Sequence, residues 1–220
     1  MDNDKITLTY FPSNTKVLIT RCMLDITKTP YTNNVMTYEE WGKIEKTCDK
    51  YEYGFLPVLE INGKSYSQSK AIDTYLARKL EFLGSNIEEE YEINNILNSQ
   101  EDFLLPIIMF VVMEAPKLSK EEVEKKIKSF NDELLPWILA VLERKFVNRK
   151  GKYFVGDKLS IADIYISAVS FLLLGKVCNK MFEETCLKHA PKLFEFAENL
   201  KTNELKDYYV NGSFNKESPY

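Results

Sequence analysis

Histidine is nearly absent from this 220-residue chain, which holds a single one, His189. General acid–base and triad chemistry most often uses His, so such a mechanism would depend on His189 alone. The four cysteines, at positions 22, 48, 178 and 186, form no Cys-x-x-Cys pair and have no metal-ligand spacing. We therefore expect no thioredoxin-type redox centre and no metal site, but reduced thiols in a cytoplasmic protein.

Long apolar segments and an excess of positive charge are missing as well. The most apolar run, residues 103–113, is shorter than the roughly 20 residues that a membrane-spanning helix needs. The first residues, MDNDKITL, lack the apolar segment of a secretory signal. The net charge of -4 disfavours nucleic-acid binding, which needs a concentrated basic face. We expect a globular protein that binds neither membranes nor nucleic acid.

The first part of the chain alternates between strand and helix patterns. The dipeptide Asn62-Gly63 between two short apolar stretches is a strong hairpin signal, because a type I′ turn needs positive φ at both central residues. Pro57 can open the first hairpin strand, since no ladder N–H is needed there. The patterns predict strands at 5–11, 29–35, 57–61 and 64–67, helices at 14–26 and 68–80, and a polar helix or an irregular segment at 37–47.

After a short break at 83–88, the chain has only helical patterns. They predict helices at 88–112, with Pro106 placed to kink it, and at 120–148, with Pro136 inside. Ser160 and Asp163 form a capping-box variant that opens an apolar, buried helix. We predict a thioredoxin-like α/β domain over residues 1–82, a linker at 83–88 and an all-helical domain over 89–220 that ends in a polar tail.

Three features of the first domain could carry chemistry. Tyr10 ends the first strand, just before a turn and a helix. The polar pair Gln68-Ser69 stands where a helix begins, and the free N–H groups and dipole of a helix N-terminus favour an anion. A cis bond before Pro57 would leave the backbone of Leu56 free to pair with an extended peptide ligand.

These features resemble the glutathione-binding half of cytosolic glutathione transferases. The sigma class is the most similar, on the segments LTYF (8–11), Glu40-Trp41, PVLEING (57–63), Gln68-Ser69 and Glu101-Asp102-Phe103. The resemblance implies a homodimer that conjugates glutathione to small hydrophobic electrophiles and detoxifies them. In such an enzyme Tyr10 would donate its hydroxyl to the glutathione sulfur and stabilise the thiolate.

The resemblance also implies a role for other residues. Gln68 and Ser69 would hold the γ-glutamyl carboxylate, and Asp102 would reach the γ-glutamyl amine across the dimer. The remaining glutathione-binding residues would be Tyr10, Lys16, Trp41, Leu56 and Pro57. The hydrophobic substrate would contact Phe11, Leu104, Met109 and Met113.

Each role has a structural alternative, and the chain departs from the family in places. Tyr10 could be an ordinary strand aromatic, Ser69 a plain N-cap, Trp41 a core residue and Asp102 a solvated charge. Lys16 replaces an Arg and loses its planar fork, Phe55 replaces a polar residue, and Glu45 stands where a basic residue is usual. The segment PSNT (12–15) lacks the usual Gly-Arg turn. A catalytically weak or inactive binding or structural relative therefore remains the alternative function.

Overall fold

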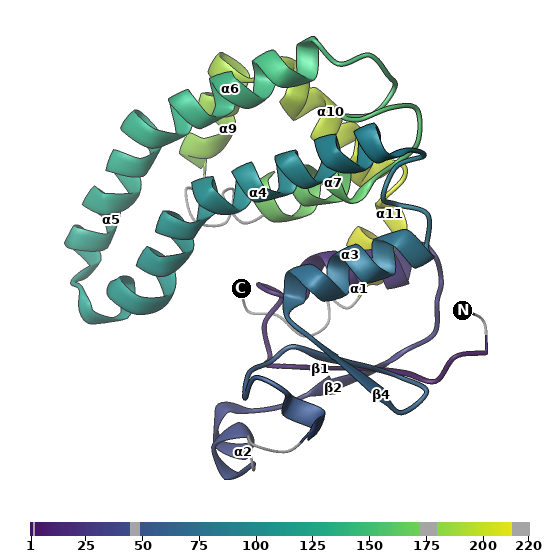
Figure 1. Ribbon diagram of the computed structural model, residues 1–220. Coiled ribbons are helices and arrows are strands. Elements are labelled where there is room, and N and C mark those ends of the chain that lie inside the picture. Colours follow the sequence, from purple (N-terminus) through teal and green to yellow (C-terminus); the bar gives the residue numbers. More distant parts are fainter. Residues whose placement is uncertain (2, 45–48, 172–179, 213–220) are drawn as a thin grey trace. The chain divides into compact units, whose positions relative to one another are not determined.

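The computed structural model describes residues 1, 3–44, 49–171 and 180–212 of the chain (Figure 1). They form two compact units. The first, here called the sheet unit, comprises Met1–Phe82 and Asn203–Tyr220, and the second, the helical unit, comprises Leu83–Thr202. An α/β part followed by helices is the fold class that the sequence predicts, and the structure confirms it.

A four-stranded mixed sheet with the order β2-β1-β3-β4 forms the centre of the sheet unit. Strand β1 pairs parallel with β2 and antiparallel with β3, and β3 pairs antiparallel with β4. The elements are β1 (Ile6–Tyr10), α1 (Leu18–Ile26), β2 (Thr32–Val35), α2 (Tyr38–Lys43), a 3-10 turn (Asp49–Tyr51), β3 (Val58–Ile61), β4 (Lys64–Ser67) and α3 (Ser69–Lys79).

The predicted hairpin is present. Asn62 and Gly63 have φ angles of 52° and 84°, the left-handed values that a type I′ turn requires. Helices α1 and α3 pack side by side on one face of the sheet, and α2 lies on its other side (Figure 1). The apolar face of α1 is buried against the sheet because Leu18, Cys22 and other apolar residues recur at helical spacing.

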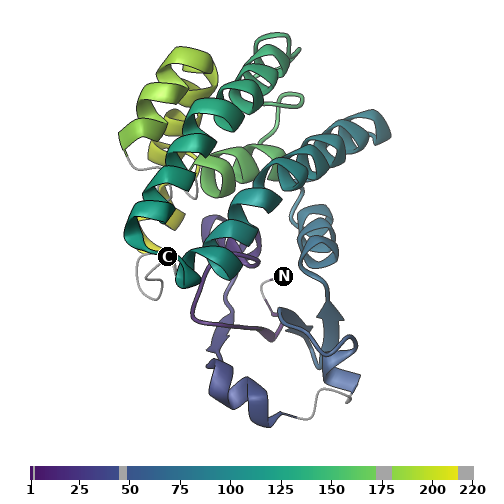
Figure 2. The same cartoon turned by 90° about the vertical axis from the view of Figure 1, so that its left-hand side faces the viewer.

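The helical unit contains no strand among its described residues. Helix α6 packs against α9 and α10, and α4 packs against α7, as both views show (Figures 1 and 2). The helices are α4 (Ile87–Met109), α5 (Lys120–Ser129), α6 (Leu135–Val147), α7 (Ile161–Ile164), α9 (Lys180–His189) and α10 (Pro191–Thr202). Short irregular helical turns cover Phe110–Glu114, Ala115–Lys117, Phe130–Leu134 and Tyr165–Phe171.

Three of these turns are π-helical, and two of the three, Phe110–Glu114 and Phe130–Leu134, precede a proline. The sequence predicts one helix over 120–148, but the structure divides it at Phe130–Leu134, which ends two residues before Pro136. Proline lacks the N–H for the helical hydrogen bond and its ring clashes with the carbonyl four residues earlier, so a local change of winding accommodates it. The turn Phe110–Glu114 likewise ends two residues before a proline, Pro116. Helix α4, in contrast, continues through Pro106.

The predicted capping box at the start of α7 is present and buried. Asp163 accepts hydrogen bonds from the Ser160 amide at 2.8 Å, the Ser160 hydroxyl at 2.9 Å and the Phe154 amide at 2.8 Å. It is fully inaccessible to solvent, with 0% of its surface exposed. The carboxylate therefore joins the start of α7 to the loop before it.

The C-terminal segment differs from the expected polar tail. Residues Lys206–Asn211 form a further helix, α11, which packs against α1 in the sheet unit. Tyr208 has 0% of its surface exposed, so burial of this aromatic side chain fixes a segment whose local composition is polar. Residues 213–220 of the expected tail lie outside the described part of the chain, and the predicted domain boundaries stay a prediction.

Candidate active site

Tyr10 lies at the end of β1, where the strand leaves the sheet. Its backbone carbonyl accepts a hydrogen bond from the Met36 amide at 2.9 Å, which fixes the end of the strand beside β2. Only 6% of the residue is exposed. The phenol oxygen lies 3.1 Å from the hydroxyl oxygen of Thr15. Tyr10 is thus a buried aromatic side chain with a hydrogen-bonded hydroxyl. This geometry fits both a tyrosine that stabilises a thiolate and an ordinary strand aromatic.

Burial raises the pKa of the Tyr10 phenol above its ordinary value. Hydrogen bonds from Thr15, the Lys16 backbone amide and Ser13 lower it by less, and the nearby Tyr38 raises it further. A phenol with a raised pKa keeps its proton at neutral pH. Tyr10 can therefore act as a hydrogen-bond donor there, but not as a base.

A buried arginine that sequence reasoning missed holds the loop between β1 and α1. Arg21 has 1% of its surface exposed. Its guanidinium donates to the Ser13 carbonyl at 2.9 Å, to the Asn14 side-chain oxygen and to the Asn33 side-chain oxygen at 2.9 Å. The available signal was a charged residue at a position of α1 whose neighbours at helical spacing are apolar. Arg21 thus ties the loop that carries Thr15 to both α1 and β2.

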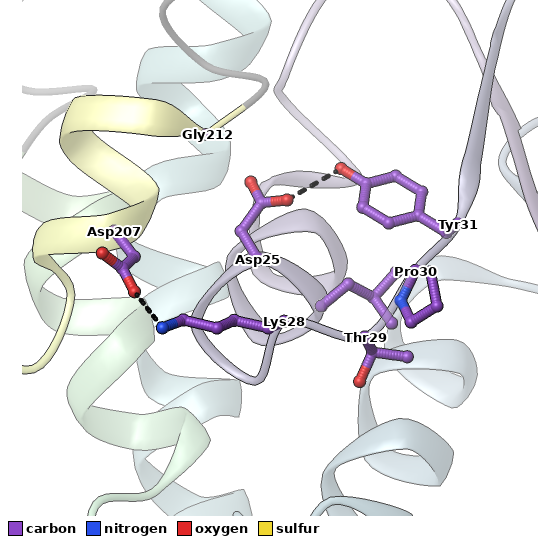
Figure 3. A pocket seen from close by; sticks show the side chains of 8 residues that line it. Asp25, Lys28, Thr29, Pro30, Tyr31, Asp207 and Gly212 are labelled. Carbon is purple, nitrogen blue, oxygen red and sulfur yellow. Dashed lines mark hydrogen bonds and ion pairs between the residues drawn. The ribbon is translucent and has the colours of Figure 1, made fainter. Parts of the chain in front are cut away.

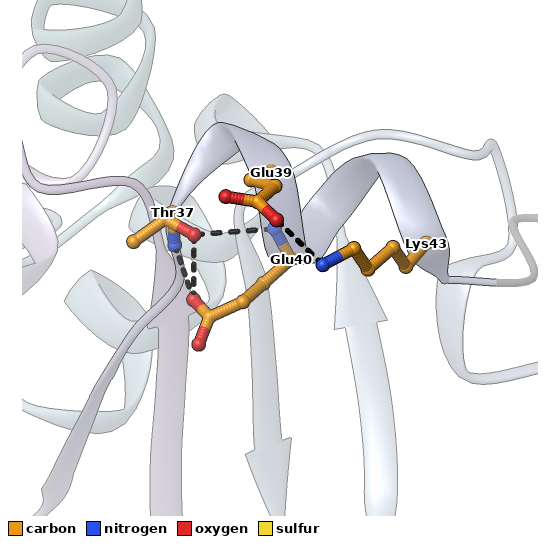
Figure 4. A network of polar contacts seen from close by, with 4 residues as sticks. All are labelled: Thr37, Glu39, Glu40 and Lys43. Carbon is orange, nitrogen blue, oxygen red and sulfur yellow. Dashed lines mark hydrogen bonds and ion pairs between the residues drawn. The ribbon is translucent and has the colours of Figure 1, made fainter.

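The capping box of α2 positions Trp41. The Thr37 hydroxyl accepts from the Glu40 amide at 3.1 Å, and Glu40 in turn accepts from the Thr37 amide at 2.7 Å (Figure 4). Lys43 adds an exposed ion pair with Glu39 at 2.6 Å. Trp41 is 9% exposed and packs edge-on against Tyr51, with ring centroids 5.0 Å apart.

An apolar cluster brings three of the predicted site residues together. Trp41 forms this cluster with Met36, Tyr51 and Val58, and Phe11 and Leu56 pack against it. Phe11 stacks on Tyr38 with ring centroids 4.4 Å apart. The Leu56–Pro57 peptide bond is cis, Leu56 is half-buried and Pro57 is buried at the start of β3.

Gln68 and Ser69 lie at the N-terminus of α3, as the sequence predicts. Gln68 is exposed and has a φ of 69°, a left-handed value that a residue with a side chain rarely adopts. Ser69 is the first residue of the 11-residue helix, and its first turn carries no acidic side chain. The amide groups and the positive dipole end are therefore not neutralised by the helix itself, and an anion would be favoured there.

Of the described residues at which the chain departs from the family, Lys16 and Phe55 lie at the surface, whereas Asn14 of the PSNT segment is buried, with 2% of its surface exposed. Lys16 is exposed, and Phe55 has 70% of its surface exposed. The Phe55 side chain therefore keeps apolar surface in contact with water. Glu45 lies outside the described residues.

The other predicted site residues belong to the helical unit. Asp102 is an exposed residue of α4, and the alternative of a solvated charge fits this exposure. Met109, at the end of α4, is 46% exposed, and Met113 in the following π-helical turn is 51% exposed. The side chain of Leu104 lies outside the described part of the structure.

A pocket lies at the opposite end of α1 from the Tyr10 loop (Figure 3). Lys28 forms an ion pair with Asp207 of α11 at 3.6 Å, and the Tyr31 hydroxyl donates to Asp25 at 3.2 Å. These two contacts pair four of the polar side chains drawn there, and the ion pair joins α11 to the segment that follows α1. Lining residues are Leu24, Asp25, Lys28, Thr29, Pro30, Tyr31, Asp207 and Gly212.

Three further observations bear on the expected chemistry. Cys22 is buried, and burial raises the pKa of its thiol well above the ordinary value, so the reactive thiolate is disfavoured. Over the residues that the structure describes, no three His, Cys, Asp or Glu side chains gather closely enough to hold a metal ion. Nor does any described helix combine the length and apolar character that crossing a bilayer requires.

A thioredoxin-like sheet unit with a hydrogen-bonded tyrosine, followed by a helical unit, defines the class to which this fold belongs. Comparison with known proteins identifies it: residues 101–211 match the family described as "Glutathione S-transferase, C-terminal domain". Glutathione S-transferase 3 of Caenorhabditis elegans is 27% identical over 206 residues, which cover 91% of this chain and 93% of that protein.

Solved structures are similar over nearly the whole chain. A Pi-class glutathione S-transferase of Onchocerca volvulus has a TM-score of 0.77 and 23% identity, and the match covers 93% of this chain and 91% of that one. At that identity the likeness is one of fold. Prostaglandin synthase D of Nilaparvata lugens has a TM-score of 0.71 and 29% identity, with 93% and 96% of the two chains covered.

The chain belongs to the glutathione S-transferase family of enzymes. The family uses glutathione as its co-substrate. The class names of the relatives differ, so the family is established without the class.

Proposed function

We propose that this enzyme conjugates reduced glutathione to small hydrophobic electrophiles, with Tyr10 as the residue that stabilises the thiolate. The observation that carries the proposal is a phenol that burial keeps protonated and whose oxygen is held in a hydrogen-bonded position at the end of β1. A protonated phenol can donate to a sulfur anion. Such a bond lowers the pKa of the thiol from about 8.5, the value of an unperturbed cysteine.

The tripeptide would be held by residues from three places in the sheet unit. Gln68 and Ser69 offer an exposed helix N-terminus with no acidic residue in its first turn, which suits the γ-glutamyl carboxylate. The backbone of Leu56 would pair with the cysteinyl part, Trp41 would contact the glycine end, and the Lys16 cation would tune Tyr10 and the thiolate. Asp102 of a second subunit would bind the γ-glutamyl amine, so the proposal includes a homodimer.

The electrophile would contact Phe11, Leu104, Met109 and Met113. Met109 and Met113 present exposed thioether side chains, which are flexible and polarizable and so adapt to ligands of varied shape. A sigma-like class, a cytoplasmic location and a role in detoxification complete the proposal. These parts of the proposal rest on the sequence segments quoted above and on the expectation of reduced cysteine thiols. They do not rest on the residues that would contact the electrophile.

Conjugation of an aryl halide by purified protein tests this function. The wild type should bind immobilised glutathione and react with 1-chloro-2,4-dinitrobenzene, and Tyr10→Phe should lower kcat/KM strongly while binding is kept. Tyr31→Phe is the matched control, because it also removes one hydrogen-bonded phenol from the sheet unit, at the other end of α1. Equal losses in both variants would contradict the role of Tyr10.

A thermal-shift measurement separates this proposal from a relative that no longer binds the tripeptide. A ligand that binds only the folded state stabilises it by about 2.7 kcal/mol at a hundredfold excess over Kd. Millimolar glutathione should therefore raise the melting temperature of the wild type. No shift, together with no conjugation of any aryl halide, would favour a binding or structural protein without transferase activity.

A further inference from the structure

Three hydroxyl groups form a chain in the loop after β1. The Ser13 oxygen lies 3.2 Å from the Thr15 oxygen, which lies 3.1 Å from the Tyr10 phenol oxygen. Thr15 is exposed whereas Tyr10 is buried. The chain therefore runs from the surface of the loop to the phenol, and Thr15 is its middle member.

The direction of these hydrogen bonds depends on which atom accepts the hydrogen bond from the Tyr10 phenol. A phenol or an aliphatic hydroxyl has one proton to donate and two lone pairs that accept. Without a ligand, Tyr10 can donate to Thr15. Once Tyr10 donates to a sulfur anion, the contact with Thr15 can persist only if Thr15 is the donor. Thr15 in turn can then accept from Ser13.

We propose that Thr15 is a positioning residue for the reaction: its hydroxyl donates to the Tyr10 oxygen and so orients the phenol proton toward the glutathione sulfur. This inference rests on the proposed role of Tyr10 as donor. Hydrogen bonds in a chain that all point the same way polarise one another, so a donor behind the phenol makes the phenol a stronger donor in front. The glutathione thiol gives its proton to solvent, and Tyr10 keeps its own.

Hydrogen bonds fix the loop between β1 and α1, so a single hydroxyl group on it can orient the Tyr10 phenol. Arg21, itself buried, donates to the carbonyl of Ser13 and to the side chain of Asn14, so the two residues before Thr15 are fixed to α1. The family resemblance leads one to expect a Gly-Arg turn in this loop. The hydroxyl at position 15 is thus a feature of this chain, which has PSNT in its place.

Other groups act on the phenol, and the test must separate them from Thr15. Tyr38, on α2, raises the phenol pKa, whereas the backbone amide of Lys16 lowers it. The Lys16 ammonium group is carried on an exposed side chain. None of these three groups changes when Thr15 is replaced by valine, which keeps the branched shape of the side chain and puts a methyl group in place of the hydroxyl.

The experiment is a pH titration of the bound glutathione thiolate by its ultraviolet absorbance, together with the pH profile of kcat/KM. Thr15→Val should raise the apparent pKa in both by about 0.3 to 0.7 pH units, because one hydrogen bond is lost that acts through the phenol. Thr15→Ser keeps the hydroxyl and should titrate as the wild type does. Ser13→Ala should cause a smaller rise than Thr15→Val.

A double-mutant cycle shows whether Thr15 acts through Tyr10. In a Tyr10→Phe background, Thr15→Val should have no further effect on either pKa. The inference is overturned if Thr15→Val leaves the pKa of bound glutathione unchanged or lowers it, or if Thr15→Ser raises this pKa as much as Thr15→Val does. It is also overturned if Thr15→Val has its full effect in the Tyr10→Phe background. If Tyr10→Phe itself leaves the pKa of bound glutathione unchanged, the proposed function fails first.

Discussion

The capping box of α2 in the sheet unit and that of α7 in the helical unit have the same hydrogen-bond pattern in opposite surroundings. Thr37 and Glu40 form an exposed box (Figure 4), whereas Ser160 and Asp163 form a buried one. The pKa of Glu40 is lowered, mainly by hydrogen bonds from Thr37. Burial instead raises the pKa of Asp163 to about 6, despite hydrogen bonds from Phe154 and Ser160.

The comparison teaches that burial, and not the motif, decides what a capping box contributes. Hydrogen bonds favour the charged carboxylate in both boxes, but loss of water outweighs them only in the second. The buried box joins a loop to a helix inside the helical unit, so we expect it to hold the fold. The exposed box only starts a short helix, and the sheet unit that contains it is expected to carry the chemistry.

Asp163→Ala should have the largest effect, on stability. It leaves the amides of Phe154 and Ser160 and the Ser160 hydroxyl buried without their acceptor, which should lower the free energy of unfolding by about 3 to 5 kcal/mol. Chemical denaturation monitored by circular dichroism measures this. A loss below about 1 kcal/mol would remove the contrast between the two boxes.

Tyr10→Phe should have the next largest effect, on chemistry and not on stability. A hydrogen bond to a charged group contributes about 1.5 to 3 kcal/mol, so kcat/KM should fall roughly 10-fold to 150-fold. Denaturation should show a change in unfolding free energy within about 1 kcal/mol. A variant that lost both activity and several kcal/mol of stability would show that the sheet unit does not separate the two properties as proposed.

Asp73→Asn extends the comparison to the sheet unit. Asp73 is a second buried carboxyl group, and it accepts fewer hydrogen bonds than Asp163 does. Thr20 donates to it at 2.6 Å, and burial raises its pKa to about 7. Since the folded state holds the proton more tightly than the unfolded chain, Asp73 makes stability fall as pH rises from about 4 to about 7.

The Asp73→Asn variant should therefore be more stable than the wild type above pH ~7, by an amount on the order of 2 kcal/mol, and equal to it near pH 4. The amide oxygen can still accept from Thr20. Thermal unfolding at several pH values measures the difference. A variant less stable than the wild type at alkaline pH would mean that the Asp73 carboxylate is stabilised by its surroundings.

Thr37→Ala should have the smallest effect, about 1 kcal/mol of stability, which is typical of an N-cap replaced by alanine. The pH dependence of its partner has the opposite sign to that of Asp73 and Asp163. Glu40 has a lowered pKa, so its contribution is present above the pKa of the unfolded chain and is lost on acidification. Glu40→Gln should thus differ most from the wild type at neutral pH, by a small shift in melting temperature.

The sequence predicts those parts of the fold that local interactions determine. The type I′ turn at Asn62-Gly63, the Ser160–Asp163 box and the start of α3 at Ser69 each depend on a few neighbouring residues, and all are present. The order of strands and helices follows from patterns of the same kind.

Long-range burial was not predictable in the same way. Arg21 and Asp73 have charged side chains, yet they are buried because the loop after β1 and the α1–α3 contact supply hydrogen-bond partners. Tyr208 belongs to a polar segment but is buried as α11 packs on α1. The hydroxyl chain at Thr15 was also not predicted, since it depends on how the loop folds back on Tyr10.

The most direct test of the account is the pKa of the glutathione thiol when bound to the enzyme, measured in the wild type and in Tyr10→Phe. If the phenol donates a hydrogen bond to the sulfur, the pKa of the bound thiol should lie near neutrality in the wild type. In the variant this pKa should rise by about 1 to 2 units, toward the ordinary value of about 8.5. The same pKa in both proteins would contradict the central claim.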